Sequence, residues 1–261
     1  MNDRLLRVLN TLSLGFTLFV NYWVNTSGNP GRSVGEISDA YPTLITPAGY
    51  AFAIWGIIYL LLISFVVFQW SGKRPGDLIS RVGPWFIVSN LANAAWIFAF
   101  LHEEFWLSVA FMFILLSSLL ALVWRLQIAI WDGGLRIIFF VWWPIAIYLG
   151  WIVTASVVNV AATLVASGWD GLGLSESTWG ILMIAVATAV YLLLTFKRNL
   201  RESAGVGCWA LVAIIVARGD GAPMVTTTAW MAVGILALAI AVHGFRGRAT
   251  SPFLKWKRGE W

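Results

Sequence analysis

The chain has 261 residues, of which 60% are hydrophobic and only 11% are charged, and its formal net charge is +5. A soluble domain carries roughly a quarter charged residues, so this composition excludes an ordinary soluble protein and predicts a polytopic membrane protein. The single cysteine, Cys208, excludes an internal disulfide and a cysteine metal cluster.

Apolar stretches follow one another along the chain, and most approach the ~20 residues that a helix needs to cross a bilayer. They cover residues 6–26, 47–70, 84–101, 105–124, 137–166, 179–196, 204–218 and 223–245. The seventh stretch is short and needs independent support. We expect an all-α, polytopic integral membrane helical bundle of about eight transmembrane helices.

The distribution of basic residues supports this count. With the N-terminus inside, 15 of the 17 basic residues fall on the inner side, and only Arg32 and Arg218 fall outside. This is a strong positive-inside pattern, and deleting the seventh stretch would move the basic tail, residues 246–261, to the outer side. We therefore expect an integral protein of a bacterial inner membrane with both termini cytoplasmic. The tail would lie against anionic lipid headgroups, which explains the positive charge without nucleic acid.

Two connections on the outer side are long. Residues 27–46 are rich in glycine and proline and are expected to form an irregular loop that ends at Pro47. Residues 167–178 are expected to lie at the outer interface around Trp169. A boundary near residue 167 separates five helices, residues 1–166, from three more, residues 167–245.

Polar and aromatic residues recur at helical spacing inside three of the apolar stretches. They are Trp55 and Tyr59 in the second, Asn93 and Trp96 in the third, and Tyr148, Trp151, Ala155 and Asn159 in the fifth. A buried amide lacks water partners in a membrane, so these residues should face the bundle interior. Aromatic rings beside polar groups suit a rigid, mostly apolar ligand with a few polar edges. Two alternatives stay open: the aromatics belong to interfacial belts, or the amides bridge helices.

These motifs resemble the TspO/MBR family of tryptophan-rich sensory proteins and translocator proteins, whose members have five transmembrane helices. The resemblance covers about residues 1–166. The matching positions are Pro47, Trp55 and Tyr59 in the second helix, Leu91, Asn93 and Trp96 in the third, and Tyr148, Trp151, Ala155 and Asn159 in the fifth. The last three helices have no counterpart in the five-helix pattern, so the chain is similar to an extended, divergent member.

The resemblance implies a pocket within the five-helix bundle, with the loop 27–46 as its lid. Family members bind tetrapyrroles such as protoporphyrin and haem, and some bind sterols or synthetic ligands. The residues implied to line or support the pocket are Trp55, Tyr59, Asn93, Trp96, Tyr148, Trp151, Ala155 and Asn159, with Tyr50 and Phe52 near its mouth. No obligatory cofactor is implied; a porphyrin or haem would be the ligand.

We therefore expect a membrane-embedded sensor or carrier of tetrapyrrole-like or other flat hydrophobic ligands. Its expected partners are membrane lipids, the ligand, and a second copy or a larger membrane complex. One alternative is a structural or assembly subunit of a pigment–protein complex. A porphyrin-degrading enzyme ranks lower because the bundle offers almost no titratable group, and His102 and His243 fall at opposite faces. A transporter ranks lower because no charged residue lies at mid-membrane.

Overall fold

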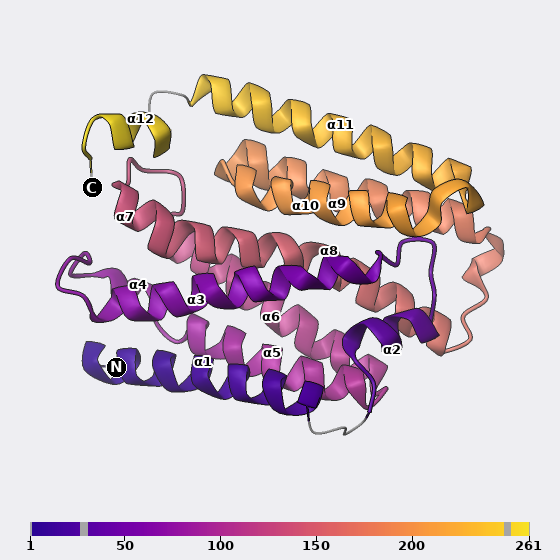
Figure 1. Ribbon diagram of the computed structural model, residues 1–261, viewed down its shortest axis with the longest axis horizontal. Coiled ribbons are helices and arrows are strands. Elements are labelled where there is room, and N and C mark those ends of the chain that lie inside the picture. The colour runs from indigo at the N-terminus through magenta and orange to yellow at the C-terminus, as the bar shows by residue number, and fades with distance from the viewer. Residues whose placement is uncertain (1, 27–30, 248–251, 261) are drawn as a thin grey trace.

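Long antiparallel helices make up the computed structural model, which describes residues 2–26, 31–247 and 252–260 (Figure 1). In this part of the chain, eight helices have 17 or more residues. They are α1 (Asp3–Thr26), α3 (Ile54–Trp70), α5 (Trp85–Leu101), α6 (Phe105–Leu126), α8 (Trp143–Ala166), α9 (Glu176–Arg198), α10 (Arg201–Arg218) and α11 (Pro223–Arg246). Their bounds follow the apolar stretches of the sequence closely.

Six helical stretches of the described residues are long and apolar enough to cross a membrane. Helix α5 is apolar but shorter, and α1 is long but carries a polar face. That face is buried and hydrogen-bonded to neighbouring helices inside the bundle: the Asn10 amide donates to Gln69 Oε1 at 3.0 Å, and the Thr17 hydroxyl donates to the Asn90 carbonyl at 2.8 Å. The predicted all-α membrane helical bundle is confirmed.

Short helical elements occupy the connections. They are α2 (Val34–Ala40), η1 (Gly49–Ala53), α4 (Leu78–Val82), α7 (Leu135–Ile137), η2 (Ile138–Trp142), η3 (Gly171–Gly173), η4 (Gly219–Gly221) and α12 (Pro252–Lys257). Helix α2 differs from the irregular loop expected there. Its N-terminus has a capping box, in which the Ser33 hydroxyl accepts from the Glu36 amide and the Glu36 carboxylate accepts from the Ser33 amide. The surrounding glycines had suggested a loop.

Helix α8 is the central element of the bundle, with α9, α10 and α11 on one side and α1 and α5 on the other (Figure 1). It continues a helical stretch that starts at Leu135 and includes a π-helical turn, η2. Pro144 lies two residues after the end of this turn and lacks the N–H for a regular helical bond. The wider turn absorbs that interruption, so the stretch continues unbroken to Ala166.

The last three helices pack directly against the first five. The Ser203 hydroxyl of α10 donates to the Ala146 carbonyl of α8 at 2.6 Å. Close to η1, the Ala48 amide donates to the Ala213 carbonyl at 3.0 Å, and the Trp209 indole donates to the Ala51 carbonyl at 3.3 Å. Helix α10 therefore supports the segment that leads into α3.

The two ends of the bundle carry opposite charge. The end that holds the beginning of α1 and the end of α11 carries almost all the described basic residues, and we name it the basic end. At the other end, the acidic end, only Arg32 and Arg218 are basic among the described residues. Its acidic residues are Glu36, Asp39, Glu103, Glu104, Asp170, Glu176 and Asp220.

Candidate ligand-binding site

An aromatic cluster forms around Trp55 of α3. The Trp55 ring stacks on Tyr59 and on Trp96, with ring centroids 5.5 and 5.9 Å away and interplanar angles of 25° and 27°. Tyr148 and Trp151 meet Trp55 edge to face at 5.9 and 6.4 Å. Such offset and edge contacts add about 0.5–1.5 kcal/mol each beyond the burial of their area. The cluster unites side chains from α3, α5 and α8.

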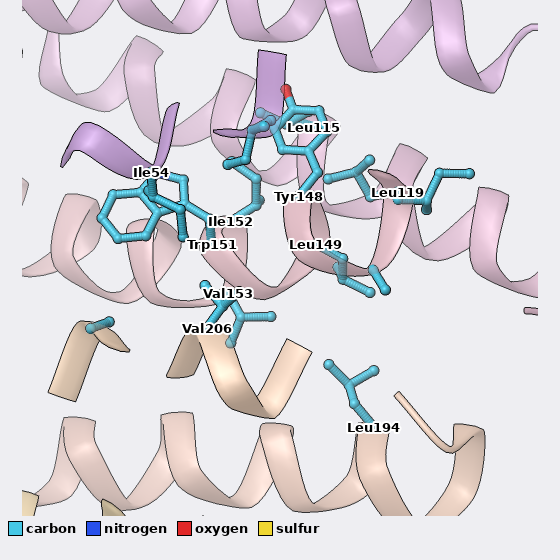
Figure 2. Packing of buried hydrophobic residues seen from close by; sticks show 14 of the residues in the cluster. Ile54, Leu115, Leu119, Tyr148, Leu149, Trp151, Ile152, Val153, Leu194 and Val206 are labelled. Atoms are coloured by element: carbon cyan, nitrogen blue, oxygen red, sulfur yellow. The ribbon is translucent and has the colours of Figure 1, made fainter. Parts of the chain in front are cut away.

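Helical spacing explains why these rings meet. Trp55 and Tyr59 lie four residues apart, and Tyr148 and Trp151 lie three apart, so each pair shares one face of its helix. Figure 2 shows Tyr148 and Trp151 on the same side of α8, whereas Val153 points to the opposite side, toward α10. Tyr148 and Trp151 are only 1% and 2% exposed. The face of α8 that carries the predicted polar and aromatic residues therefore faces the interior of the first five helices.

Asn93 of α5 forms hydrogen bonds to residues of α1 and α8 beside the aromatic rings. Its amide nitrogen donates to the Tyr148 hydroxyl at 2.8 Å, and its Oδ1 accepts from the Asn21 amide of α1 at 3.2 Å. Asn93 is fully buried, so both partners are needed to satisfy it. The amide thus fixes the orientation of the Tyr148 ring. Asn21 was not predicted, because its polarity alone does not reveal which helix it faces.

Asn159 has a similar role near the acidic end. Its Oδ1 accepts from the Trp96 indole at 3.4 Å and from the Ser108 hydroxyl of α6 at 3.3 Å, and its amide lies 3.1 Å from the same hydroxyl. The three contacts link α5, α6 and α8 and hold the Trp96 ring in its stack. Ser108 was also missed, since a serine in a membrane helix usually bonds to its own backbone.

A small cavity lies beside the aromatic cluster. Its volume is about 30 Å³, which is close to the volume of one water molecule in the liquid. It is lined by Val34, Ser38, Pro47, Phe52, Trp55, Trp96, Phe100, Trp151, Thr154, Ala155, Val158 and Asn159. The buried Trp151 indole N–H has no hydrogen-bond partner among the described residues. A donor left unpaired in an apolar wall costs about 1–3 kcal/mol, so it favours an acceptor placed in this cavity.

Helix α2 closes the cavity from the acidic end. Val34 and Ser38 are part of the lining, and Glu103, in the turn between α5 and α6, pairs with Arg32 just before the helix. The Tyr41 hydroxyl, just after the helix, donates to the other oxygen of the Glu103 carboxylate. Glu103 has a φ of +60°, a conformation that non-glycine residues rarely adopt. We name these two contacts the Glu103 latch.

The capping box gives α2 a local electrostatic support. The Ser33 amide, which donates to the Glu36 carboxylate, and secondly the nearby Ser33 side chain lower the pKa of Glu36 below its ordinary value of 4.5. The nearby Arg32 acts in the same direction more weakly. The ionised Glu36 carboxylate therefore strengthens the hydrogen bond from the Ser33 amide at the start of the helix.

The predicted site residues meet at this cluster with one exception. Phe52, Trp55, Trp96, Trp151, Ala155 and Asn159 line the cavity, and Tyr59, Asn93 and Tyr148 lie behind it. Tyr50 lies apart: η1 turns its ring toward Trp209 of α10, with 5.2 Å between centroids, and leaves it 41% exposed. The lining residues that the sequence analysis missed are Val34, Ser38, Phe100, Thr154 and Val158.

The cavity is also smaller than a pocket for the ligands that the resemblance implies. Aromatic rings fill most of the space between α3, α5 and α8, and ligand pockets usually have roughly 300–1,000 Å³. The cavity of about 30 Å³ is far smaller. A ligand of tetrapyrrole size requires α2 to move and the rings to part.

Comparison with known proteins gives one family. The family described as TSPO-like protein matches residues 7–242. The matched region extends from α1 to the last turns of α11, so it includes the three helices that the five-helix pattern lacks. No curated protein and no solved structure matches the chain.

Proposed function

This chain belongs to the TSPO-like protein family, and from this premise we propose that it is a membrane-embedded sensor or carrier of flat hydrophobic ligands. The ligand class that fits best is tetrapyrrole-like. The observation that carries the proposal is the Trp55-centred aromatic cluster beside a cavity in which a buried indole N–H has no partner among the described residues. Flat rings bind planar ligands by stacking, and the N–H accommodates a carbonyl or carboxylate at the ligand's edge.

Stacking alone does not make the cluster a binding site, because the rings already stack on each other. Trp55 exchanges its contact with Trp96 for a contact with the ligand when the two rings separate. The amide bridges at Asn93 and Asn159 stay intact in this exchange because neither depends on the Trp55 ring. The ligand thus replaces ring–ring contacts by equivalent ones and adds a partner for Trp151.

Entry of the ligand is controlled by α2 in this proposal. The helix provides two side chains of the cavity lining, and the Glu103 latch holds it at both ends. The unfavourable φ of Glu103 is a cost that a glycine would avoid, which supports a role for its carboxylate. Opening of the latch would expose the cluster at the acidic end. We also propose that the basic end faces the cytoplasm of a bacterium, as the positive-inside pattern predicts.

Titration of the detergent-purified chain with protoporphyrin IX tests the proposal, with tryptophan quenching and the Soret band as readouts. Trp151→Phe removes the unpaired donor, and Trp55→Phe reduces the central stacking surface. We expect saturable binding that weakens about tenfold in each variant, which corresponds to ~1.4 kcal/mol. Trp230→Phe is the matched control, since Trp230 lies on α11 with 55% of its surface exposed.

Two outcomes would overturn the proposal. One is the absence of saturable binding by a protein whose circular dichroism remains helical. The other is binding that Trp230→Phe weakens as much as Trp55→Phe does, which would indicate porphyrin adsorbed on the lipid-facing surface. Either result would favour the alternative, an assembly subunit of a larger membrane complex. Co-purification of partners at fixed stoichiometry would then test that role.

A further inference from the structure

A second cavity lies at the acidic end, away from the aromatic cluster. It has a volume of about 240 Å³. Its walls come from the segment 42–45, from the last turns of α8, from the connection that contains η3, and from the start of α9. We name it the outer cavity. It is several times larger than the cavity beside Trp55, so it can accept a small ligand without rearrangement.

Two indole rings form one wall of the outer cavity. Trp169 and Trp179 meet edge to face, with centroids 4.8 Å apart and an interplanar angle of 60°. The Trp179 indole donates to the Gly171 carbonyl at 2.7 Å, which fixes its position and uses its only donor. Gly171 has a φ of +74°, which favours glycine at this position. Both indole rings therefore line the cavity, with Trp179 offering no free N–H.

Both ionisable residues that line the outer cavity are acidic. Asp170 and Glu176 stand on its border, and no lysine, arginine or histidine occurs among the described residues that line it. The two basic residues of the acidic end are engaged elsewhere: Arg32 pairs with Glu103, and Arg218 donates to the Thr46 carbonyl at 3.2 Å. The cavity consequently combines negative charge with indole surfaces.

We propose that the outer cavity binds a small organic ammonium cation. An ammonium group is attracted both by carboxylates and by the face of an indole ring. An anion would be repelled by Asp170 and Glu176, and a neutral apolar molecule would gain nothing from them. The remaining wall includes Leu44 and Met183, which suits the methyl or methylene groups of an amine. The same chemistry is offered by a free amine and by the ammonium headgroup of a lipid.

This inference does not rest on the proposed function, because none of its four polar or aromatic residues touches the cavity beside Trp55. Hydrogen bonds within the connection between α8 and α9 hold Asp170 and Glu176 in place. The Asp170 carboxylate accepts from the Leu172 amide at 3.0 Å, and the Ser175 hydroxyl accepts from the Thr178 amide at the start of α9. Asp170 and Glu176 are thereby held beside the two rings.

Calorimetric titration of the full-length, detergent-purified chain with choline tests the proposal, and 3,3-dimethyl-1-butanol serves as the uncharged probe of the same shape. We expect choline to bind saturably and the alcohol to bind at least tenfold more weakly. The Asp170→Asn/Glu176→Gln variant should weaken choline binding about tenfold, while the amide oxygen that Asp170→Asn introduces can still accept from the Leu172 amide. Trp169→Leu should weaken it several-fold, and Trp230→Phe should leave it unchanged.

Equal affinity for choline and the alcohol would overturn the proposal, as would choline binding that survives the double substitution. Retained helical circular dichroism and thermal midpoint would exclude misfolding as the cause of any loss. The source of the cation is distinguished by repeating the titration in nanodiscs. If lipid headgroups are the natural ligand, choline binds in phosphatidylglycerol discs but is outcompeted in phosphatidylcholine discs. If a free amine is the ligand, the affinity is the same in both.

Discussion

The two sides of α8 are packed by different kinds of side chain. Toward α1, α3, α5 and α6, large aromatic rings and amides make the contacts described above. Toward α10, the helices approach so closely that a Cβ on Gly150 would lie 2.8 Å from the Ser203 Cα. Helices α9 and α10 are packed as closely behind it, because a Cβ on Gly207 of α10 would lie 2.6 Å from the Tyr191 ring of α9.

This difference separates a scaffold from a binding surface. Lipid tails give helices no hydrophobic reason to associate, so small residues that permit close backbone contact hold membrane helices together. The α10 side follows this rule and adds hydrogen bonds to backbone carbonyls, such as the bond from the Tyr191 hydroxyl to the Gly150 carbonyl at 2.7 Å. The ring side, by contrast, leaves the Trp151 indole N–H without a hydrogen-bond partner among the described residues. Ligand binding is therefore expected on one side of α8, and rigidity on the other.

The largest effect is expected from Gly150→Ala, which tests whether the α10 side is a rigid scaffold. The new methyl group would press against the backbone of α10, which cannot move aside as a flexible side chain can. Overpacking of this kind costs about 1–3 kcal/mol. We expect a lower thermal midpoint in detergent and a lower yield of folded protein.

Gly234→Ala is the matched control for this substitution. Gly234 lies within α11, and no heavy atom would come within 4 Å of its new Cβ. Alanine in a helix interior is favoured over glycine by about 1 kcal/mol, so this variant should be as stable as the parent or more so. Equal midpoints for the two variants would contradict the close-packed interface.

Asn93→Leu is expected to have the next largest effect, because it removes the buried amide that joins α1, α5 and α8. The Tyr148 hydroxyl and the Asn21 amide would each lose a partner. Polar contacts between membrane helices contribute about 0.6–2 kcal/mol, and we expect a loss of stability in this range. Unfolding in denaturant measures it, and protoporphyrin binding should weaken as Tyr148 loses its orientation.

A serine outside the cluster provides the comparison for Asn93. Among the residues that the structure describes, the Ser64 hydroxyl bonds only to the Leu61 carbonyl of its own helix. Ser64→Ala should therefore change neither stability nor binding measurably. If Asn93→Leu behaved like Ser64→Ala, the amide would not be a structural bridge, and the ring side of α8 would depend on shape alone.

The sequence was sufficient to predict the helices and the meeting of most site residues. Hydropathy marks the spans, and a spacing of three or four residues places Trp55 with Tyr59 and Tyr148 with Trp151 on shared faces. Asn21 and Ser108 escaped prediction because the partner of a polar side chain depends on how each helix is rotated about its axis. Rotation is determined by packing between helices, which a single sequence does not reveal.

Two local features could also not be predicted from the pattern of apolar residues. Tyr50 was expected at the pocket mouth, but the 3₁₀ turn η1 breaks the helical spacing that relates it to Trp55 and directs it toward Trp209. Helix α2 was not predicted because glycines surround it and suggested an irregular loop, although Ser33 and Glu36 have the spacing of a capping box. The closed state of the cavity depends on both elements, so it could not be predicted.

A smaller effect on stability is expected when the latch of α2 is weakened by Glu103→Gln. The pair with Arg32 is about a third to a half exposed, and exposed ion pairs contribute only about 0–1 kcal/mol. The rate of protoporphyrin association should nevertheless rise several-fold in stopped-flow fluorescence, because α2 opens more often. Glu104→Gln changes the charge of an exposed neighbour and should leave the rate as it is. Identical rates in both variants would show that entry does not pass under α2.

The smallest effect is expected from pH. Because the pKa of Glu36 is lower in the folded protein than its ordinary value of 4.5, the capping box stabilises α2 fully above pH 4.5. This contribution is lost as the pH falls below 4.5 through the folded-state pKa, when protonation removes the charge that strengthens the bond from the Ser33 amide. Hydrogen-exchange protection of residues 34–40 should decline over this range more in the parent than in Glu36→Gln, compared at each pH. Asp39→Asn should retain the parent's decline. An equal decline in the parent and in Glu36→Gln would mean that the Glu36 carboxylate does not stabilise α2. The Glu103 latch would then be the contact that keeps α2 over the cavity.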